Sequence, residues 1–143
     1  MRGFAYGLRA TVHYLVGIEF IEAHMLSNGY QDLKVWQKSL AMVVAVYGGT
    51  ESFPKREVFG LTSQIRRAAV SVIANIAEGH GRTTGGEYRN CLSVARGSLK
   101  ELETLLIIAH ALAYIDENTL NALMNRCVEI SKMLTGLKRS IRR

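Results

Sequence analysis

Five polar side chains between residues 64 and 78 are the first group in this chain whose types and spacing could do chemistry. At about 100° per residue, spacings of three and four bring them onto one face of a helix. Such a face could form a polar network in the protein interior. It could also line a groove or channel between subunits that receives a ligand or a nucleic-acid strand. The members of this polar stripe are Gln64, Arg67, Ser71, Asn75 and Glu78.

The interior interpretation of the polar stripe makes a specific prediction about pairing. A buried charge is tolerated only when it is paired and hydrogen-bonded. We therefore expect Arg67 to contact a glutamate such as Glu101 or Glu103. Asn75 would then cap a neighbouring backbone.

Basic side chains form the second candidate group, and their chemistry would be contact with phosphate. The chain has a net charge of +6, and six of its 18 basic residues lie between Arg126 and Arg143, with Glu129 as the one acid there. Clustered cations could bind a nucleic-acid backbone without reading its sequence. They could equally be solvated helix faces and favourable partners of the last helix dipole. The candidate phosphate contacts are Arg66, Arg82, Arg89, Arg96, Lys100, Lys138, Arg139, Arg142 and Arg143.

Catalytic or metal chemistry is not indicated. The four histidines share no ligand spacing, so we predict no metal site. We expect His80 to be a solvated loop residue and His110 to lie in or at the edge of the core. No glycine-rich phosphate loop follows a strand. We therefore predict no catalytic residue, no cofactor and no enzyme. The histidines are His13, His24, His80 and His110.

Four helices joined by short connections must position these groups. Apolar residues at spacings of three and four predict a first helix over about residues 32–47, ended by Gly48, Gly49 and Thr50. The second helix, which carries the polar stripe, follows Gly60. We expect Gly79 and Gly81 to end it through positive φ.

The third and fourth helices begin with recognisable caps. Thr84 and Glu87 have the spacing of a capping box, and the third helix continues to about residue 113. Asp116 caps the fourth helix, whose apolar positions continue to Ile141. Short links between amphipathic helices favour antiparallel neighbours. The sequence thus predicts an all-α, antiparallel, up-down-up-down four-helix bundle.

The remaining face of the second helix predicts self-association. Its small side chains would let a helix of another subunit approach closely, so we expect a subunit contact there. The residues of this small-residue face are Ser63, Val70, Ala74 and Ala77. Cys91 and Cys127 lie at apolar positions without CxxC spacing, which predicts buried free thiols in a reducing cytoplasm.

Residues 1–29 differ from the bundle domain, which we place at residues 30–143. Their apolar run is too short and too polar to span a membrane, and it is a poor match to a secretion signal. Two interpretations remain. Either translation naturally starts at Met25, or residues 6–24 form an accessory helix that packs on the bundle.

Three motifs resemble one protein family over residues 30–141. They are LKVWQK at residues 33–38, FGLTSQIRRAAVSVIANIAEG at residues 59–79, and EYRNCLSVARGSLKELETLL at residues 87–106. Their pattern resembles the four-helix proteins encoded in intervening sequences of bacterial 23S ribosomal RNA genes, also labelled the S23 ribosomal protein family. One departure is Val72 and Ile73, where the family often has proline. Gly97 in mid-helix predicts close helix packing, because glycine there costs about 1 kcal/mol relative to alanine.

The resemblance also implies an assembly and a class of partner. Proteins of similar fold assist the reverse transcriptases of diversity-generating retroelements and form basic pentameric barrels. The resemblance therefore implies a homo-oligomeric ring, expected to be a homopentamer. We expect a nonenzymatic, cytoplasmic accessory protein that binds RNA or DNA electrostatically, with a reverse transcriptase as one conceivable protein partner. The alternative is a protein-protein interaction module that does not bind nucleic acid.

Overall fold

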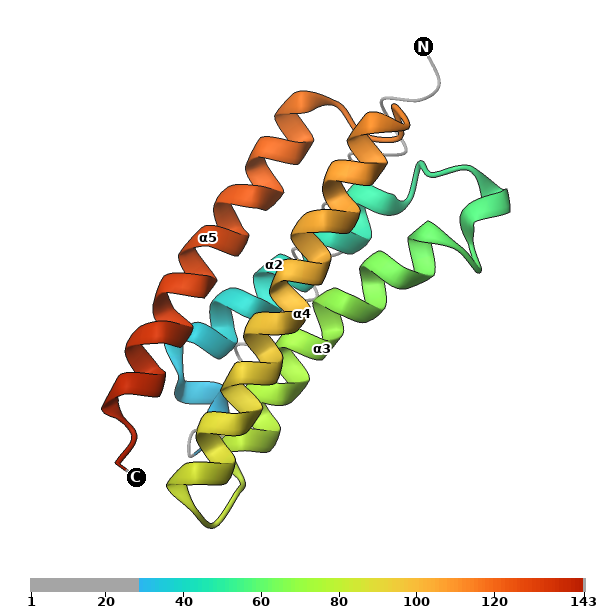
Figure 1. The fold of residues 1–143 in the computed structure, drawn as a ribbon. Helices are drawn as coiled ribbons and strands as arrows, with labels where there is room; N and C mark the ends of the chain where they lie inside the picture. The colour runs from blue at the N-terminus through green and yellow to red at the C-terminus, as the bar shows by residue number, and fades with distance from the viewer. Residues whose placement is uncertain (1–28, 143) are drawn as a thin grey trace.

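Four long helices dominate the computed structural model, which describes residues 29–142 (Figure 1). Successive helices run antiparallel, and each contacts two neighbours, so that α5 closes the bundle against α2. The elements are η1 (Tyr30–Asp32), α2 (Lys34–Thr50), η2 (Lys55–Glu57), α3 (Leu61–His80), α4 (Gly85–Ala111) and α5 (Glu117–Ser140). The predicted all-α four-helix bundle is confirmed. The expectations for residues 1–28 lie outside the described part of the chain.

The core is built from the apolar positions that repeat along each helix. Large side chains from all four helices have at most 1% of their surface exposed, and they meet along the axis of the bundle. Burial of such side chains stabilises a fold by about 1.5–3 kcal/mol each relative to leaving them exposed. Representative members are Met42, Ile65, Ile76, Leu92, Leu99, Leu102, Leu106, Ile130 and Leu134. In residues 29–142 no helix is both long enough and apolar enough to cross a membrane.

Both predicted helix caps are present. The Thr84 hydroxyl oxygen accepts a hydrogen bond from the Glu87 amide, and the hydroxyl donates to the Glu87 carboxylate at 2.7 Å. The Asp116 carboxylate accepts a hydrogen bond of 2.7 Å from the Thr119 amide. These contacts satisfy amides that a helix start leaves without partners. They fix where α4 and α5 begin.

The first helix ends at Thr50, but the predicted boundary near residue 47 is wrong, because α2 includes Gly48, Gly49 and Thr50. The Thr50 hydroxyl is buried and donates to the Val46 carbonyl at 2.9 Å, which keeps this residue within the last turn. In the described part of the chain, nothing lies within 4 Å of a Cβ added at Gly48, so no neighbour there interrupts the helix.

The role predicted for Gly79 is also wrong. Gly79 lies inside α3 and is buried, and Gly81, which ends the helix, has a φ of −81°. A Cβ at Gly79 would come within 2.7 Å of the Tyr88 ring and 2.9 Å of Cys91 Cβ. Gly79 therefore permits the close approach of α3 and α4. Gly97, where we expected close packing, is exposed, and nothing in another helix of residues 29–142 lies within 4 Å of an added Cβ.

The α2–α3 and α4–α5 connections lie at the same end of the bundle and contact each other. Glu57 accepts a hydrogen bond from the Leu61 amide at 2.9 Å through one carboxylate oxygen. Its other oxygen accepts from the Tyr114 hydroxyl at 3.2 Å. The Tyr114 ring lies 5.4 Å from that of Phe53, measured between centroids. Glu57 thus caps α3 and joins the α2–α3 connection to the α4–α5 connection.

Candidate nucleic-acid interface

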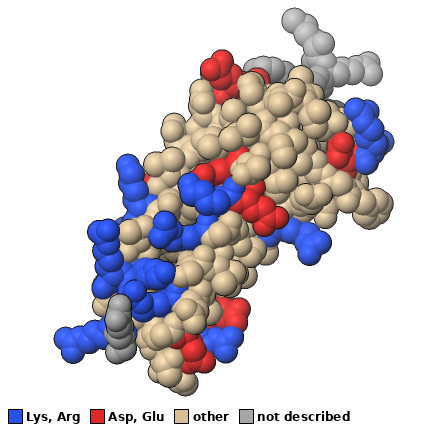
Figure 2. All heavy atoms as spheres, viewed as in Figure 1, with Lys and Arg blue, Asp and Glu red and all other residues tan. Residues whose placement is uncertain are grey.

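Lysine and arginine side chains gather over the C-terminal half of α5 and the adjoining part of α4 (Figure 2). All but one of the residues that we assign to this basic surface are exposed, and Lys138 is half-buried. The basic surface consists of Arg96, Lys100, Lys132, Lys138, Arg139 and Arg142. Lys132 was not among the predicted phosphate contacts, although it lies seven residues before Arg139 and so on nearly the same face of the helix. Arg143 lies outside the described residues.

Several members of the basic surface have no partner within the described chain. Arg96, Lys132, Arg139 and Arg142 form no ion pair or side-chain hydrogen bond with any residue from 29 to 142. Lys100 is engaged by Glu103, at 2.8 Å between Nζ and the carboxylate. Four cations are therefore available to an external anion.

Arg89 has a structural role that the sequence did not predict. Its guanidinium donates to the Lys138 carbonyl at 2.8 Å and to the Ile141 carbonyl at 3.4 Å. The carbonyls of the last helical turn lack partners within the helix, so Arg89 holds the end of α5 against α4. The Lys138 ammonium in turn donates to the Ser93 hydroxyl at 2.5 Å. Arg89 is therefore committed to the protein backbone, not directed at an external phosphate.

Two other predicted phosphate contacts are engaged elsewhere. The Arg66 guanidinium lies 4.5 Å from the centre of the Tyr47 ring, and its Nε donates to the Thr50 hydroxyl at 2.9 Å. Arg66 thus joins α3 to α2. Arg82 pairs with Glu78 one turn earlier in the chain, an ion pair that raises the pKa of Arg82. Neither arginine belongs to the basic surface.

The polar stripe lies at the surface of the bundle and not in its interior. Gln64, Arg67 and Glu78 are exposed, while Ser71 and Asn75 are half-buried. Within residues 29–142, Arg67 forms no ion pair with Glu101 or Glu103, and one carboxylate oxygen of Glu103 pairs with Lys100 instead. The prediction of an interior charged pair is wrong for the single chain. Exposure of the guanidinium removes the need for a partner.

The half-buried members of the stripe join α3 to α4. The Ser71 and Ser98 hydroxyl oxygens are 2.8 Å apart, within hydrogen-bonding distance. The Asn75 amide donates to the Ser71 carbonyl at 2.8 Å, so Asn75 bonds to its own helix and not to a neighbouring one as expected. Ser71, Asn75 and Ser98 therefore provide one another with hydrogen-bond partners where α3 packs against α4.

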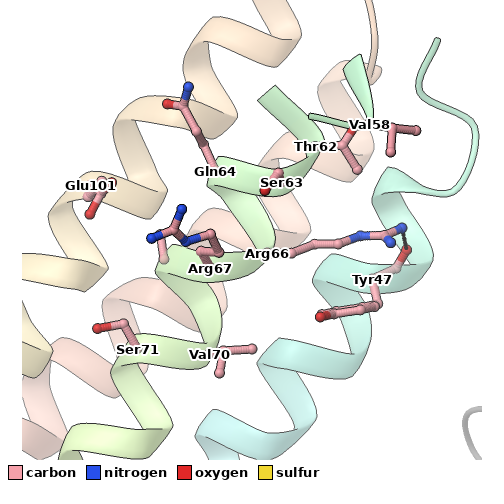
Figure 3. A pocket seen from close by; sticks show the side chains of 11 residues that line it. Tyr47, Val58, Thr62, Ser63, Gln64, Arg66, Arg67, Val70, Ser71 and Glu101 are labelled. Carbon is pink, nitrogen blue, oxygen red and sulfur yellow. Dashed lines mark hydrogen bonds between the residues drawn. The ribbon is translucent and has the colours of Figure 1, made fainter. Parts of the chain in front are cut away.

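An open groove of about 940 Å³ runs along the outer side of α3. Figure 3 shows that Arg66 extends from α3 toward Tyr47 on α2, whereas Arg67 extends toward the side where Glu101 of α4 lies. Ser63, Val70 and Ser71 of α3 also line the groove. The small-residue face also faces this side, with Val70 and Ala74 exposed and Ser63 and Ala77 half-buried. No helix of residues 29–142 covers Val70 or Ala74.

The histidines and cysteines of residues 29–142 lie outside the basic surface. Within residues 29–142, no group of three or more His, Cys, Asp or Glu side chains could hold a metal ion. His80, the last residue of α3, is exposed and lies edge-on to Tyr88. His110 is exposed, contrary to the prediction, and its Nδ1 lies 3.1 Å from the carbonyl oxygen of Ile115 in the α4–α5 connection.

The two cysteines differ in their surroundings. Both are free thiols, but only Cys127 is buried. Burial raises the pKa of the Cys127 thiol to about 12. Its Sγ lies 3.9 Å from the Met42 sulfur, which places it in the core between α5 and α2. Cys91 is half-buried beside Gly79, so the prediction of two buried thiols holds for one.

The fold and the surface define a small helical-bundle protein with a basic side. The chain belongs to the 23S rRNA-intervening sequence protein family, whose pattern matches residues 31–136. It is similar to the crystal structure of a protein of unknown function from the S23 ribosomal protein family of Bacteroides thetaiotaomicron VPI-5482. The two share 25% sequence identity, with a TM-score of 0.69, over 74% of this chain and 96% of the other. No curated protein matches the chain.

Proposed function

We propose that this protein is a nonenzymatic accessory protein that binds nucleic acid through the phosphate backbone. The observation that carries the proposal is the gathering of exposed cations on one surface, four of them unpaired within the described chain. Cations that neutralise phosphates release condensed counterions and so favour binding without regard to sequence. Family membership fits this proposal through the gene location in ribosomal RNA intervening sequences, but it names no ligand.

Binding should depend steeply on salt. Each phosphate contact contributes about 0.9 to the slope of log K against log salt concentration for a duplex. Four contacts would weaken binding by roughly two orders of magnitude between about 50 mM and about 200 mM salt. Fluorescence anisotropy with labelled duplex DNA and RNA at these two salt concentrations measures the effect.

Charge variants at two ends of the molecule provide the matched comparison. Arg139→Gln with Arg142→Gln removes two exposed cations from the basic surface. Lys55→Gln with Arg56→Gln removes two exposed cations from η2, at the opposite end of the bundle. We expect the first variant to lower the salt slope by about 2 and the second to leave it unchanged. Equal effects of both variants, or binding insensitive to salt, would contradict the proposal.

Self-association is part of the proposal, because the small-residue face and the groove along α3 have no cover in the described chain. A homo-oligomeric ring, as the resemblance to pentameric barrels implies, would cover them and bring several basic surfaces together. Light scattering coupled to size exclusion measures the assembly. A species of about five subunits supports the ring, and a monomer at all concentrations contradicts it.

A second candidate function is a protein-protein interaction module. Phe59 is 97% exposed and neighbours Val58, which is 50% exposed, so the α2–α3 connection presents an apolar surface to solvent. Exposed apolar patches often mark interaction sites. A protein partner that remains bound after nuclease treatment, and that is lost on Phe59→Ser but not on Arg139→Gln, would favour this function over nucleic-acid binding.

A further inference from the structure

We infer that the ligand of the basic surface is a double helix and not a single strand. The inference rests on the proposed function and specifies its partner. Three observations carry it: the fixed relation between α4 and α5, the dimensions of the cation array, and the location of the aromatic side chains.

The basic surface is held rigidly where it crosses from α4 to α5. Arg89 binds two backbone carbonyls at the end of α5, and Lys138 binds Ser93 of α4. A Cβ added at Gly85, the first residue of α4, would lie 2.1 Å from the Arg142 carbonyl oxygen, so the two helix ends are in close contact. A fixed backbone that carries these cations suits a ligand whose phosphates are also fixed. A double helix provides such phosphates, whereas a flexible single strand gains nothing from the rigidity and loses entropy by adapting to it.

The dimensions of the array match the grooves of a duplex. At 1.5 Å per residue, the α5 cations from Lys132 to Arg139 extend over about 10 Å, and Arg142 follows just after the helix ends at Ser140. Packed helices lie about 8–10 Å apart, which separates the α5 row from Arg96 and Lys100 on α4. Two rows at this distance can contact phosphates on both sides of a groove about 6–12 Å wide. A single strand presents only one such row.

Aromatic side chains are absent from the basic surface within residues 29–142. Proteins that bind single strands stack bases on exposed aromatic rings. Here the rings are used in other ways: Tyr30 lies against Trp36, Tyr47 beneath Arg66, and Phe53 against Tyr114. Tyr88 is half-buried beside His80, and Phe59 lies on the α2–α3 connection, away from the end of α5. The surface can therefore hold phosphates but cannot stack bases.

The test compares a labelled duplex with each of its separated strands at about 50 mM salt, using unstructured strands of equal length and the full chain. We expect the duplex to bind at least about tenfold more tightly than either strand, with a salt slope near −4. Equal binding of duplex and strands, or tighter binding of a strand, would overturn this inference while the proposed function stood. Binding of neither would overturn both.

A positioning variant separates rigidity from charge. Arg89→Lys keeps the positive charge but replaces the planar guanidinium, one terminal nitrogen of which donates to both carbonyls, by a flexible ammonium that should hold them less firmly. If the fixed array selects the duplex, this variant lowers the ratio of duplex to single-strand affinity by at least about threefold while total charge is unchanged. Arg126→Lys on α5, at an exposed position outside the basic surface and without a partner in the described chain, is the control and should leave the ratio unchanged. An unchanged ratio in Arg89→Lys, with helix content retained, would contradict the role assigned to rigidity.

Discussion

The Arg89 guanidinium on α4 lies 2.8 Å from the carbonyl oxygen of Lys138 in the last turn of α5. This contact fixes the end of α5 against α4, and with it the backbone of Lys138, Arg139 and Arg142. Arg89 thus both stabilises this end of the bundle and positions the basic residues there.

Replacing Arg89 by methionine should destabilise the protein. The variant keeps much of the side-chain volume but removes two hydrogen bonds to carbonyls of α5. Because Arg89 is only half-buried, we expect a loss of about 1–2 kcal/mol in the free energy of unfolding. Urea denaturation followed by circular dichroism measures it. The control, Arg96→Met on the same helix, should change stability by less than about 0.5 kcal/mol; equal losses in both variants would show that the carbonyl contacts contribute little.

Two glycines of the central helices should respond in opposite directions to alanine. Gly79→Ala places a methyl group 2.7 Å from the Tyr88 ring and 2.9 Å from Cys91 Cβ, so α3 and α4 must separate. We expect this to cost about 1–3 kcal/mol. Gly97→Ala adds a methyl group in open space within a helix and should stabilise the protein by about 0.5–1 kcal/mol. Thermal melts of both variants test the pair, and a destabilised Gly97→Ala would imply a contact at that position outside the described chain.

The cap of α5 should make stability depend on pH in acid. Hydrogen bonds from the Thr119 amide and hydroxyl lower the pKa of Asp116 below its ordinary value. The charged form is favoured in the folded state, so this contribution is present above the ordinary pKa of about 3.9 and is lost as pH falls through the folded value. Asp116→Asn keeps an acceptor oxygen but cannot titrate. The urea midpoints of the unchanged protein and of Asp116→Asn should differ less at about pH 3 than at about pH 7. A difference that does not change with pH would show that the Asp116 carboxylate does not cause the pH dependence.

Cys127 should be protected from thiol reagents in the folded protein. Its side chain has no exposed surface, and burial raises its pKa to about 12, so both access and thiolate formation are suppressed. Cys91 is half-buried and should react first. Labelling with iodoacetamide, followed by peptide mass spectrometry, distinguishes the two, and Cys91→Ser isolates the core thiol. Reaction of Cys127 at the rate of Cys91 under native conditions would mean that the seam between α2 and α5 opens readily.

Sequence periodicity was sufficient for the helices and their starts, because apolar spacing and the caps at Thr84 and Asp116 are local properties. The glycines were harder to interpret. Whether a glycine ends a helix, as expected of Gly79, or permits close packing depends on which residue of another helix lies opposite. That information is not local, and the same limit explains the mistaken expectation of close packing at Gly97.

The candidate interface was predictable in outline only. Clustering of cations near the end of the chain is visible in the sequence, and Lys132 could have been included from its spacing to Arg139. The separate uses of Arg66, Arg82 and Arg89 could not be seen, because each partner is fixed by packing or by a competing local contact. A count of positive charges therefore overestimates the number of cations that are available to a ligand.

Gly79 lets α3 and α4 pack closely, and the Ser71–Ser98 contact links the two helices. The four helices should therefore differ in their stability against local unfolding. In amide hydrogen exchange α3 and α4 should form the slowest unit, and α5, which shares the least contact with its neighbours, should open ahead of them. The basic surface lies across the boundary between the slow unit and the fast one. An anion bound there would close that boundary, and the ligand would be detected as slowed exchange along α5 while α3 stayed unchanged.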